Sequence, residues 1–109
     1  MTDLKLPEPI AAYFNADKRD GEAIARCFTT RAIVKDEGQT HCGPAAIKAW
    51  KTEASAKYSY TSEPFAVEEK EGRYVVTSRL TGNFPGSPVD LRFVFRLEGR
   101  KIVSLEITP

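Results

Sequence analysis

The apolar residues recur every three or four positions in the first half of the chain and every second position in the rest. A period near 3.6 residues is typical of an amphipathic helix, so the first half predicts helices. The three predicted helices span residues 10–18, 20–28 and 45–57. Pro9 and Pro44 lie in the first turn of the first and third helices, where the missing N–H of proline costs little.

Six extended segments are predicted, two before the third helix and four after it. Residues 32–36 run into a turn at 37–39 and return through 40–42, which is the pattern of a hairpin. The four later segments span residues 58–68, 73–81, 89–97 and 101–107. Residues 89–97 alternate most clearly, which predicts an antiparallel strand with one core face and one wetter face. Pro64 interrupts the first of the four, so we expect a bulge or an edge strand there.

Helices followed by an antiparallel meander indicate the α+β class. The 109 residues suit a single domain spanning 1–109. Three helices can cover only one face of a sheet of this size. We therefore expect a cone-shaped, strongly curved, mainly antiparallel sheet of about six strands packed on three helices, with a ligand site in its concavity.

Composition limits the partners of this chain. Sixteen basic and fifteen acidic residues give a net charge of +1, whereas nucleic-acid binding usually needs a clearly basic domain. No apolar run approaches the ~18 residues of a membrane span, and the N-terminus lacks the pattern of a signal peptide. Cys27 and Cys42 match no metal or redox spacing. We expect free thiols in a reducing cytoplasm, and neither a metal nor another cofactor.

Five passages of the sequence are similar to passages of one protein family. They are Tyr13–Phe14, the run from Asp20 to Ile24, the run from Ala32 to Gly38, the run from Thr40 to Ile47, and the run from Gly82 to Val89. Together they resemble the SnoaL-like branch of the nuclear transport factor 2-like superfamily. The resemblance implies a conical sheet, a pocket between it and the first and third helices, and frequently a homodimer packed through the outer sheet face. The superfamily includes isomerases, cyclases, epoxide hydrolases and domains without catalytic activity, so the fold does not decide the function.

Asp36 is the first candidate for chemistry. By its surroundings it corresponds to the pocket aspartate that acts as the base in ketosteroid isomerase. A carboxylate at the mouth of an apolar cavity is suited to taking a proton from a carbon next to a carbonyl, because burial disfavours its charged form. The alternative is that Asp36 only caps the backbone of the following turn.

Tyr13 and His41 are the candidate partners of Asp36. Ketosteroid isomerase uses a first-helix tyrosine as an oxyanion donor, and Tyr13 corresponds to it; the alternative is a core or wall residue. His41 is the only histidine and can act as an acid or base near neutral pH. An inward His41 would face Asp36 across the cavity mouth, whereas an outward one would simply be exposed.

Four aromatic residues are expected to shape the ligand site: Phe28, Trp50, Phe84 and Phe93. Trp50 suits a wall for a flat apolar ligand, and Phe84 lies in a glycine- and proline-rich loop that could cover the open end. Phe93 stands where ketosteroid isomerase carries its second donor, an aspartate. A phenyl ring donates no hydrogen bond, and losing one such donor costs about a hundredfold in rate, so steroid isomerisation of that type is not expected.

Two functions stay open at this point. The first is a pocket protein for a small apolar or carbonyl-bearing molecule, with isomerase, cyclase or hydrolase chemistry through proton transfer at Asp36. The second is a non-catalytic ligand-binding or dimeric scaffold domain, whose cone Trp50, Phe84 and Phe93 would largely fill. Epoxide hydrolysis of the limonene type is a third option, but it needs two inward carboxylates around an arginine, and the sequence indicates only Asp36.

Overall fold

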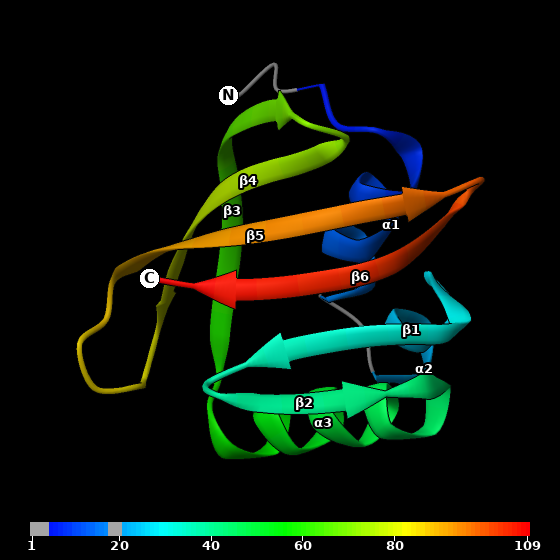
Figure 1. Ribbon diagram of the computed structural model, residues 1–109. Helices are drawn as coiled ribbons and strands as arrows, with labels where there is room; N and C mark the ends of the chain where they lie inside the picture. Colours follow the sequence, from blue (N-terminus) through cyan, green and yellow to red (C-terminus); the bar gives the residue numbers. More distant parts are fainter. Residues whose placement is uncertain (1–4, 18–20) are drawn as a thin grey trace.

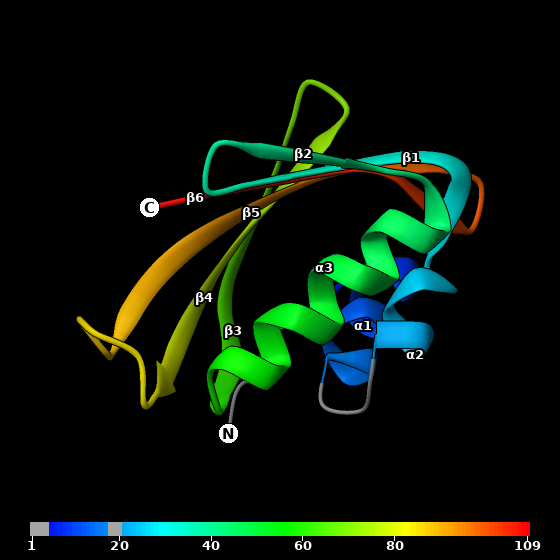
Figure 2. The ribbon, with the colours of Figure 1, turned by 90° about the horizontal axis from the view of Figure 1, so that it is seen from below.

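The computed structural model describes residues 5–17 and 21–109. In that part of the chain, six strands form one curved sheet and three helices lie together on one of its faces (Figures 1 and 2). The helices are α1 (Glu8–Ala16), α2 (Gly21–Ala25) and α3 (Gly43–Lys57). The strands are β1 (Phe28–Asp36), β2 (Gln39–Cys42), β3 (Tyr60–Lys70), β4 (Arg73–Gly82), β5 (Val89–Glu98) and β6 (Lys101–Thr108).

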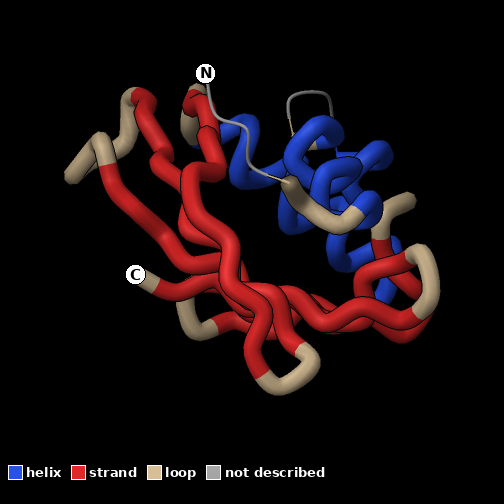
Figure 3. The backbone as a smooth tube through the Cα atoms, turned by 90° about the horizontal axis from the view of Figure 1, so that it is seen from above, coloured by secondary structure: helices blue, strands red, loops and turns tan. Residues whose placement is uncertain are grey.

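The strand order across the sheet is β2-β1-β6-β5-β4-β3. Strands β3 to β6 form the expected antiparallel meander, and the only parallel neighbours are β1 and β6 in this described sheet. The predicted α+β class, with a mainly antiparallel six-stranded sheet on three helices, is therefore confirmed. The sheet stays open, since β2 and β3 are its two edges. Figure 3 shows how it curves around the helical layer.

Several predicted element ends are wrong, and Phe28 shows why. The periodicity assigns Phe28 to the second helix, but α2 ends at Ala25 and Phe28 begins β1, where it pairs with Ile102 of β6. Strand pairing across the molecule overrides the local helical period here. Strand β3 starts at residue 60 rather than 58. The predicted helix ends at residues 18 and 20 lie outside the described residues.

The predicted hairpin turn after residue 36 and the predicted edge position of Pro64 are confirmed. Glu37 and Gly38 both have positive φ, 51° and 76°, as a two-residue hairpin turn between twisted strands requires. Strand β3 is an edge strand, and its register with β4 shifts between Pro64 and Ala66. A proline is tolerated there because the lost donor would face no central neighbour.

The core fills the space between the helices and the concave face of the sheet. Tyr13 and Phe14 of α1 pack edge-on against Phe95 of β5, with ring centroids 5.4 and 5.9 Å from it. Alternation on β5 buries Phe93 and Phe95 on the predicted core face and leaves Arg92 and Arg96 exposed on the outer face. Both cysteines are free thiols. Among the described residues, no helix is long and apolar enough to cross a membrane.

Candidate functional site

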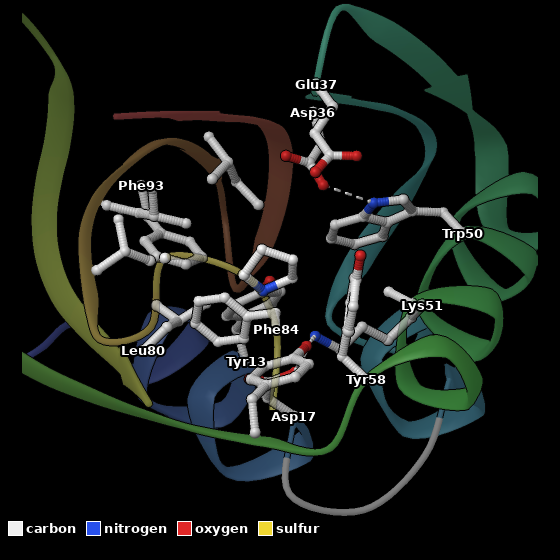
Figure 4. A pocket seen from close by; sticks show the side chains of 17 residues that line it. Tyr13, Asp17, Asp36, Glu37, Trp50, Lys51, Tyr58, Leu80, Phe84 and Phe93 are labelled. Carbon is white, nitrogen blue, oxygen red and sulfur yellow. Dashed lines mark hydrogen bonds and ion pairs between the residues drawn. The ribbon is translucent and has the colours of Figure 1, made fainter. Parts of the chain in front are cut away.

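A cavity of about 450 Å³ lies between the sheet and helices α1 and α3 (Figure 4). Most of its wall is apolar and comes from the last strands of the meander and the β4–β5 loop. The principal apolar lining residues are Leu80, Phe84, Pro85, Leu91, Phe93 and Ile107. Two separate groups of polar side chains interrupt this wall, one around Asp36 and one around Lys51.

Asp36 lies at the last position of β1, on the inner face of the sheet. The register pairs it with Ile107 of β6, which also lines the cavity. The indole N–H of Trp50 on α3 donates a hydrogen bond to Asp36 Oδ2 at 3.1 Å. Asp36 Oδ1 accepts no hydrogen bond from the described residues. The carboxylate is thus held by one oxygen and leaves the other free at the cavity (Figure 4).

Tyr13 lines the same cavity from α1 and is only 1% exposed. Burial raises the pKa of Tyr13 well above its ordinary value, and the negative charges of Asp17 and Asp36 raise it further. The phenol therefore stays protonated at neutral pH. Its hydroxyl forms no hydrogen bond with the described residues, so its proton is available to a molecule in the cavity.

His41 does not line this cavity. The register sets His41 opposite Val34, on the inner face, but its ring packs against the ring of Trp50 with centroids 5.9 Å apart. It lines a neighbouring hollow of about 220 Å³ that also reaches Asp36 and Trp50. Asp36 takes its hydrogen bond from Trp50 instead, because α3 brings the indole N–H to that carboxylate.

Three of the four predicted aromatic residues, Trp50, Phe84 and Phe93, lie on the cavity wall. They line the cavity without filling it. Phe28 does not: it is 5% exposed and packs edge-on against Tyr13 at 6.1 Å, within the core. Since Phe28 begins β1 rather than ending a helix, its side chain lies behind Tyr13 and away from the cavity.

A buried polar cluster of Asp17, Lys51 and Tyr60 forms the second polar part of the wall, and we call it the lysine cluster. The side chains of Lys51 and Asp17 are 5% and 8% exposed and form an ion pair. Lys51 Nζ also donates to the Tyr60 hydroxyl, which donates in turn to Asp17 Oδ1 at 3.4 Å. All three residues line the cavity: Asp17 follows α1, Lys51 lies on α3 and Tyr60 begins β3.

The lysine cluster carries one positive and one negative charge at neutral pH. Burial lowers the pKa of Lys51, but the charge and hydrogen bonds of Asp17 and Tyr60 raise it more, so the net shift is upward. Burial raises the pKa of Tyr60, and the opposing effect of Lys51 is smaller. Lys51 is therefore an ammonium group and Tyr60 a neutral phenol.

Comparison with known proteins assigns the family. No protein-family model and no curated protein sequence matches the chain. Among solved structures, a candidate polyketide cyclase from Sinorhizobium meliloti is 36% identical, with a TM-score of 0.89 over 94% of this chain and 95% of that one. This chain belongs to the SnoaL-like branch of the nuclear transport factor 2-like superfamily.

More distant structures share the SnoaL-like fold. A ketosteroid isomerase-like protein from Catenulispora acidiphila, in complex with trimethylamine, is 18% identical with a TM-score of 0.85, over 96% of this chain and 87% of that one. SalBIII is an epoxide hydrolase/cyclase-like enzyme with a role in pyran ring formation in the polyether salinomycin. It is 21% identical with a TM-score of 0.76, over 92% of this chain and 86% of that one. At such identities the likeness shows the fold alone.

The lysine cluster of this SnoaL-like protein was missed in the sequence, although α3 carries a signal for it. Ile47, Trp50 and Lys51 share one helical stripe, since they are spaced by three and four positions. A lysine on the buried stripe of a helix needs a partner, because burying an unpaired charge is costly. The identity of the partners depends on the fold and has no sequence signal.

In the part of the SnoaL-like chain that the structure describes, no group of three or more histidine, cysteine, aspartate or glutamate side chains comes together. The polar groups that line the cavity include a carboxylate, a phenol and a buried ammonium group, which can act as base, hydrogen-bond donor and cation.

Proposed function

We propose that this SnoaL-like protein is an enzyme that transfers a proton within an apolar carbonyl compound, as an isomerase or a cyclase does, with Asp36 as the base. The observation that carries the proposal is the Asp36 carboxylate, held through Oδ2 by Trp50 and free at Oδ1, in the same apolar cavity as the protonated Tyr13. The polyketide cyclase assignment of the Sinorhizobium meliloti relative supports the same class of reaction.

Asp36 begins the reaction by removing a proton from the carbon next to the ligand carbonyl. The electron pair of that C–H bond becomes an enolate, whose oxygen accepts a hydrogen bond from Tyr13. In an isomerisation, Asp36 returns the proton to another carbon of the enolate system. In a cyclisation, the enolate carbon attacks a second carbonyl of the same molecule, a C–C bond forms, and the new alkoxide takes the proton from Asp36. Neither route needs an external reagent.

Phe93 limits how strongly the enolate is stabilised. It lies on the cavity wall with its ring 6.2 Å from that of Tyr13, and it donates no hydrogen bond. Tyr13 is thus the single phenol donor that we assign to the enolate oxygen. An activated C–H, such as one between two carbonyls or on a carbon next to an aromatic ring, fits this weaker stabilisation better than an ordinary ketone.

The size of the cavity sets the size of the ligand. An apolar cavity of about 150 Å³ holds benzene, so about 450 Å³ holds roughly three six-membered rings or a folded chain of equal bulk.

The open cavity bears on the alternative of a scaffold domain. A cone filled by side chains would have favoured a scaffold, but this cavity is open and its apolar lining suits a compact ligand. Three expectations stay predictions: that the chain binds no nucleic acid, that it is cytoplasmic and that it is a single domain.

Deuterium exchange tests the role of Asp36. With 2-tetralone as the probe in D₂O, proton NMR would follow loss of the signal next to the carbonyl, above the rate in buffer. We expect Asp36→Asn to lower the exchange rate at least a hundredfold, because an amide is a far weaker base, and Glu63→Gln to leave it unchanged. Equal rates for wild type, Asp36→Asn and buffer would favour the non-catalytic binding function.

We also propose that a second copy of the chain packs on the outer sheet face. Apolar residues from three strands lie on that face: Ile33, Val75 and Val94. Arg79 and Asp90 form an exposed ion pair beside them, with Nε and Oδ1 2.9 Å apart. Val75 and Val94 are paired neighbours, whereas Ser104 and Glu106 of β6 lie between Val94 and Ile33. Apolar and charged side chains are therefore mixed on this face, a mixture that a protein interface accommodates.

A further inference from the structure

Among the described residues, two partners accept hydrogen bonds from Lys51, which leaves one donor of its ammonium group on the cavity wall without a partner. An ammonium group has three N–H bonds. One goes to Asp17 and one to the Tyr60 hydroxyl, and no other hydrogen bond of Lys51 is formed with the described residues. The ammonium group also lies 5.6 Å from the ring centre of Trp50.

A purely structural role explains this cluster poorly. Taking a lysine and an aspartate out of water costs several kcal/mol each, and a buried ion pair is seldom more stable than apolar residues of similar volume. The side chains lie on the cavity wall, where apolar residues would serve the packing equally well. A buried, ion-paired donor at that place is instead suited to a ligand that brings its own oxygen.

The lysine cluster and Asp36 lie apart on the wall. In Figure 4, Asp36 lies at one end of the view, whereas Asp17 and Lys51 lie toward the other. One small ligand group therefore cannot meet both. A ligand that uses both must carry polar groups at two positions.

We propose that Lys51 binds a carbonyl or hydroxyl oxygen of the substrate, at the opposite end from the carbon that Asp36 deprotonates. This inference rests on the proposed function and names its substrate class: a compact, largely apolar molecule of about three rings or equal bulk, oxygenated at both ends. Asp17 balances the charge of Lys51, so the site selects a neutral oxygen acceptor over a carboxylate. Tyr60 and Asp17 are positioning residues that direct the third N–H into the cavity.

A matched pair of probes tests the inference: 2-acetylnaphthalene and 2-ethylnaphthalene, which share the ring system and differ in the carbonyl oxygen. We expect wild type to bind the ketone about 10- to 100-fold more tightly, as a hydrogen bond to a charged group allows. The variant Asp17→Leu/Lys51→Met/Tyr60→Phe keeps the volume and removes the polarity. It should bind both probes alike, while Tyr74→Phe, outside the cavity, keeps the preference. Titration calorimetry gives the affinities.

A second measurement needs no variant. In wild type with ¹³C-labelled lysine, the Lys51 ε-methylene signal should shift with 2-acetylnaphthalene and not with 2-ethylnaphthalene. The inference is overturned if that signal does not shift with the ketone. It is also overturned if the triple variant still binds the ketone more tightly than 2-ethylnaphthalene, or if only Tyr13→Phe abolishes this difference in affinity. Failure of the proposed function has a different result. The wild type would then exchange the protons of 2-tetralone no faster than buffer does, while still binding 2-acetylnaphthalene more tightly than 2-ethylnaphthalene.

Discussion

Gly82 shows how a single position controls the backbone beside the cavity. It ends β4, close to the segment that leads into β3. A Cβ at this position would lie 2.2 Å from the carbonyl oxygen of Ser59 and 2.6 Å from the Cβ of Tyr60. Neither neighbour can move without shifting the backbone, so only glycine fits. The close approach also places Tyr60 at the lysine cluster and begins the loop that carries Phe84.

Replacing Gly82 by alanine should destabilise the protein by about 1–3 kcal/mol, the usual cost of forcing extra atoms into a packed site. Urea unfolding followed by circular dichroism measures the change. Thr81→Ala, at the exposed neighbouring position, is the control and should cost about 0.5 kcal/mol or less. A Gly82→Ala protein as stable as wild type would mean that the Ser59 carbonyl is free to move.

At the scale of elements, the lysine cluster links a helix end, a helix face and a strand start. Asp17 follows α1, Lys51 lies on the buried face of α3, and Tyr60 begins β3. The Tyr60–Asp17 hydrogen bond joins residues 43 positions apart. The elements that enclose the cavity are therefore tied together at the cavity itself, which holds its wall in shape.

Lys51→Met should cost about 3–5 kcal/mol of stability, because it leaves the Asp17 carboxylate buried without its cation. The variant Asp17→Leu/Lys51→Met/Tyr60→Phe should recover most of that loss. As a matched control, Arg79→Met breaks an ion pair whose side chains are 59% and 43% exposed, and should cost about 0–1 kcal/mol. Chemical unfolding at pH 7 provides all three values; equal losses for Lys51→Met and Arg79→Met would contradict the buried pair.

At the scale of the whole molecule, the raised pKa values make stability fall in alkali. The pKa values of Tyr13 and Tyr60 are raised from 10.0 and that of Lys51 from 10.5. Above about pH 10 the unfolded chain releases protons that the folded protein keeps, so the free energy of unfolding decreases as pH rises. The contribution is fully present below the unfolded pKa values.

Urea midpoints between pH 8 and 11 should therefore drop steeply above pH 10 in wild type. The fall of the urea midpoint with pH should be less steep in Asp17→Leu/Lys51→Met/Tyr60→Phe. Of Tyr13, Lys51 and Tyr60, this variant keeps only Tyr13 as a titrating group. Tyr74→Phe should follow the wild-type curve. Parallel curves for wild type and the triple variant would show that the cluster does not couple folding to alkaline titration.

The outer sheet face makes a prediction about assembly. We expect light scattering after gel filtration to give twice the 12.1 kDa of one chain. Val94→Asp should give the monomer, since it replaces an apolar side chain of this face by a negative charge beside Glu106, whereas Ser55→Asp on the exposed side of α3 should stay dimeric. A monomeric wild type at every concentration would refute the packing of two copies through this face.

The sequence by itself determined the fold class and the buried faces of its strands. Apolar spacing reports which side of its own helix or strand a residue takes, so it was enough for the α+β class, the meander and the buried Phe93, whereas a pocket role for Asp36 came only from the family resemblance. The Glu37–Gly38 turn follows from local chemistry as well, because its positive φ values favour glycine.

Only the tertiary structure decided which side chains meet. Phe28 joined β1 because Ile102 of β6 pairs with it, and His41 packed on Trp50, outside the cavity that Asp36 lines. Asp17, Lys51 and Tyr60 come together because the curvature of the sheet brings the start of β3 to α1 and α3. Periodicity carries no information on such meetings, since they depend on how separate elements pack and how strongly the sheet bends.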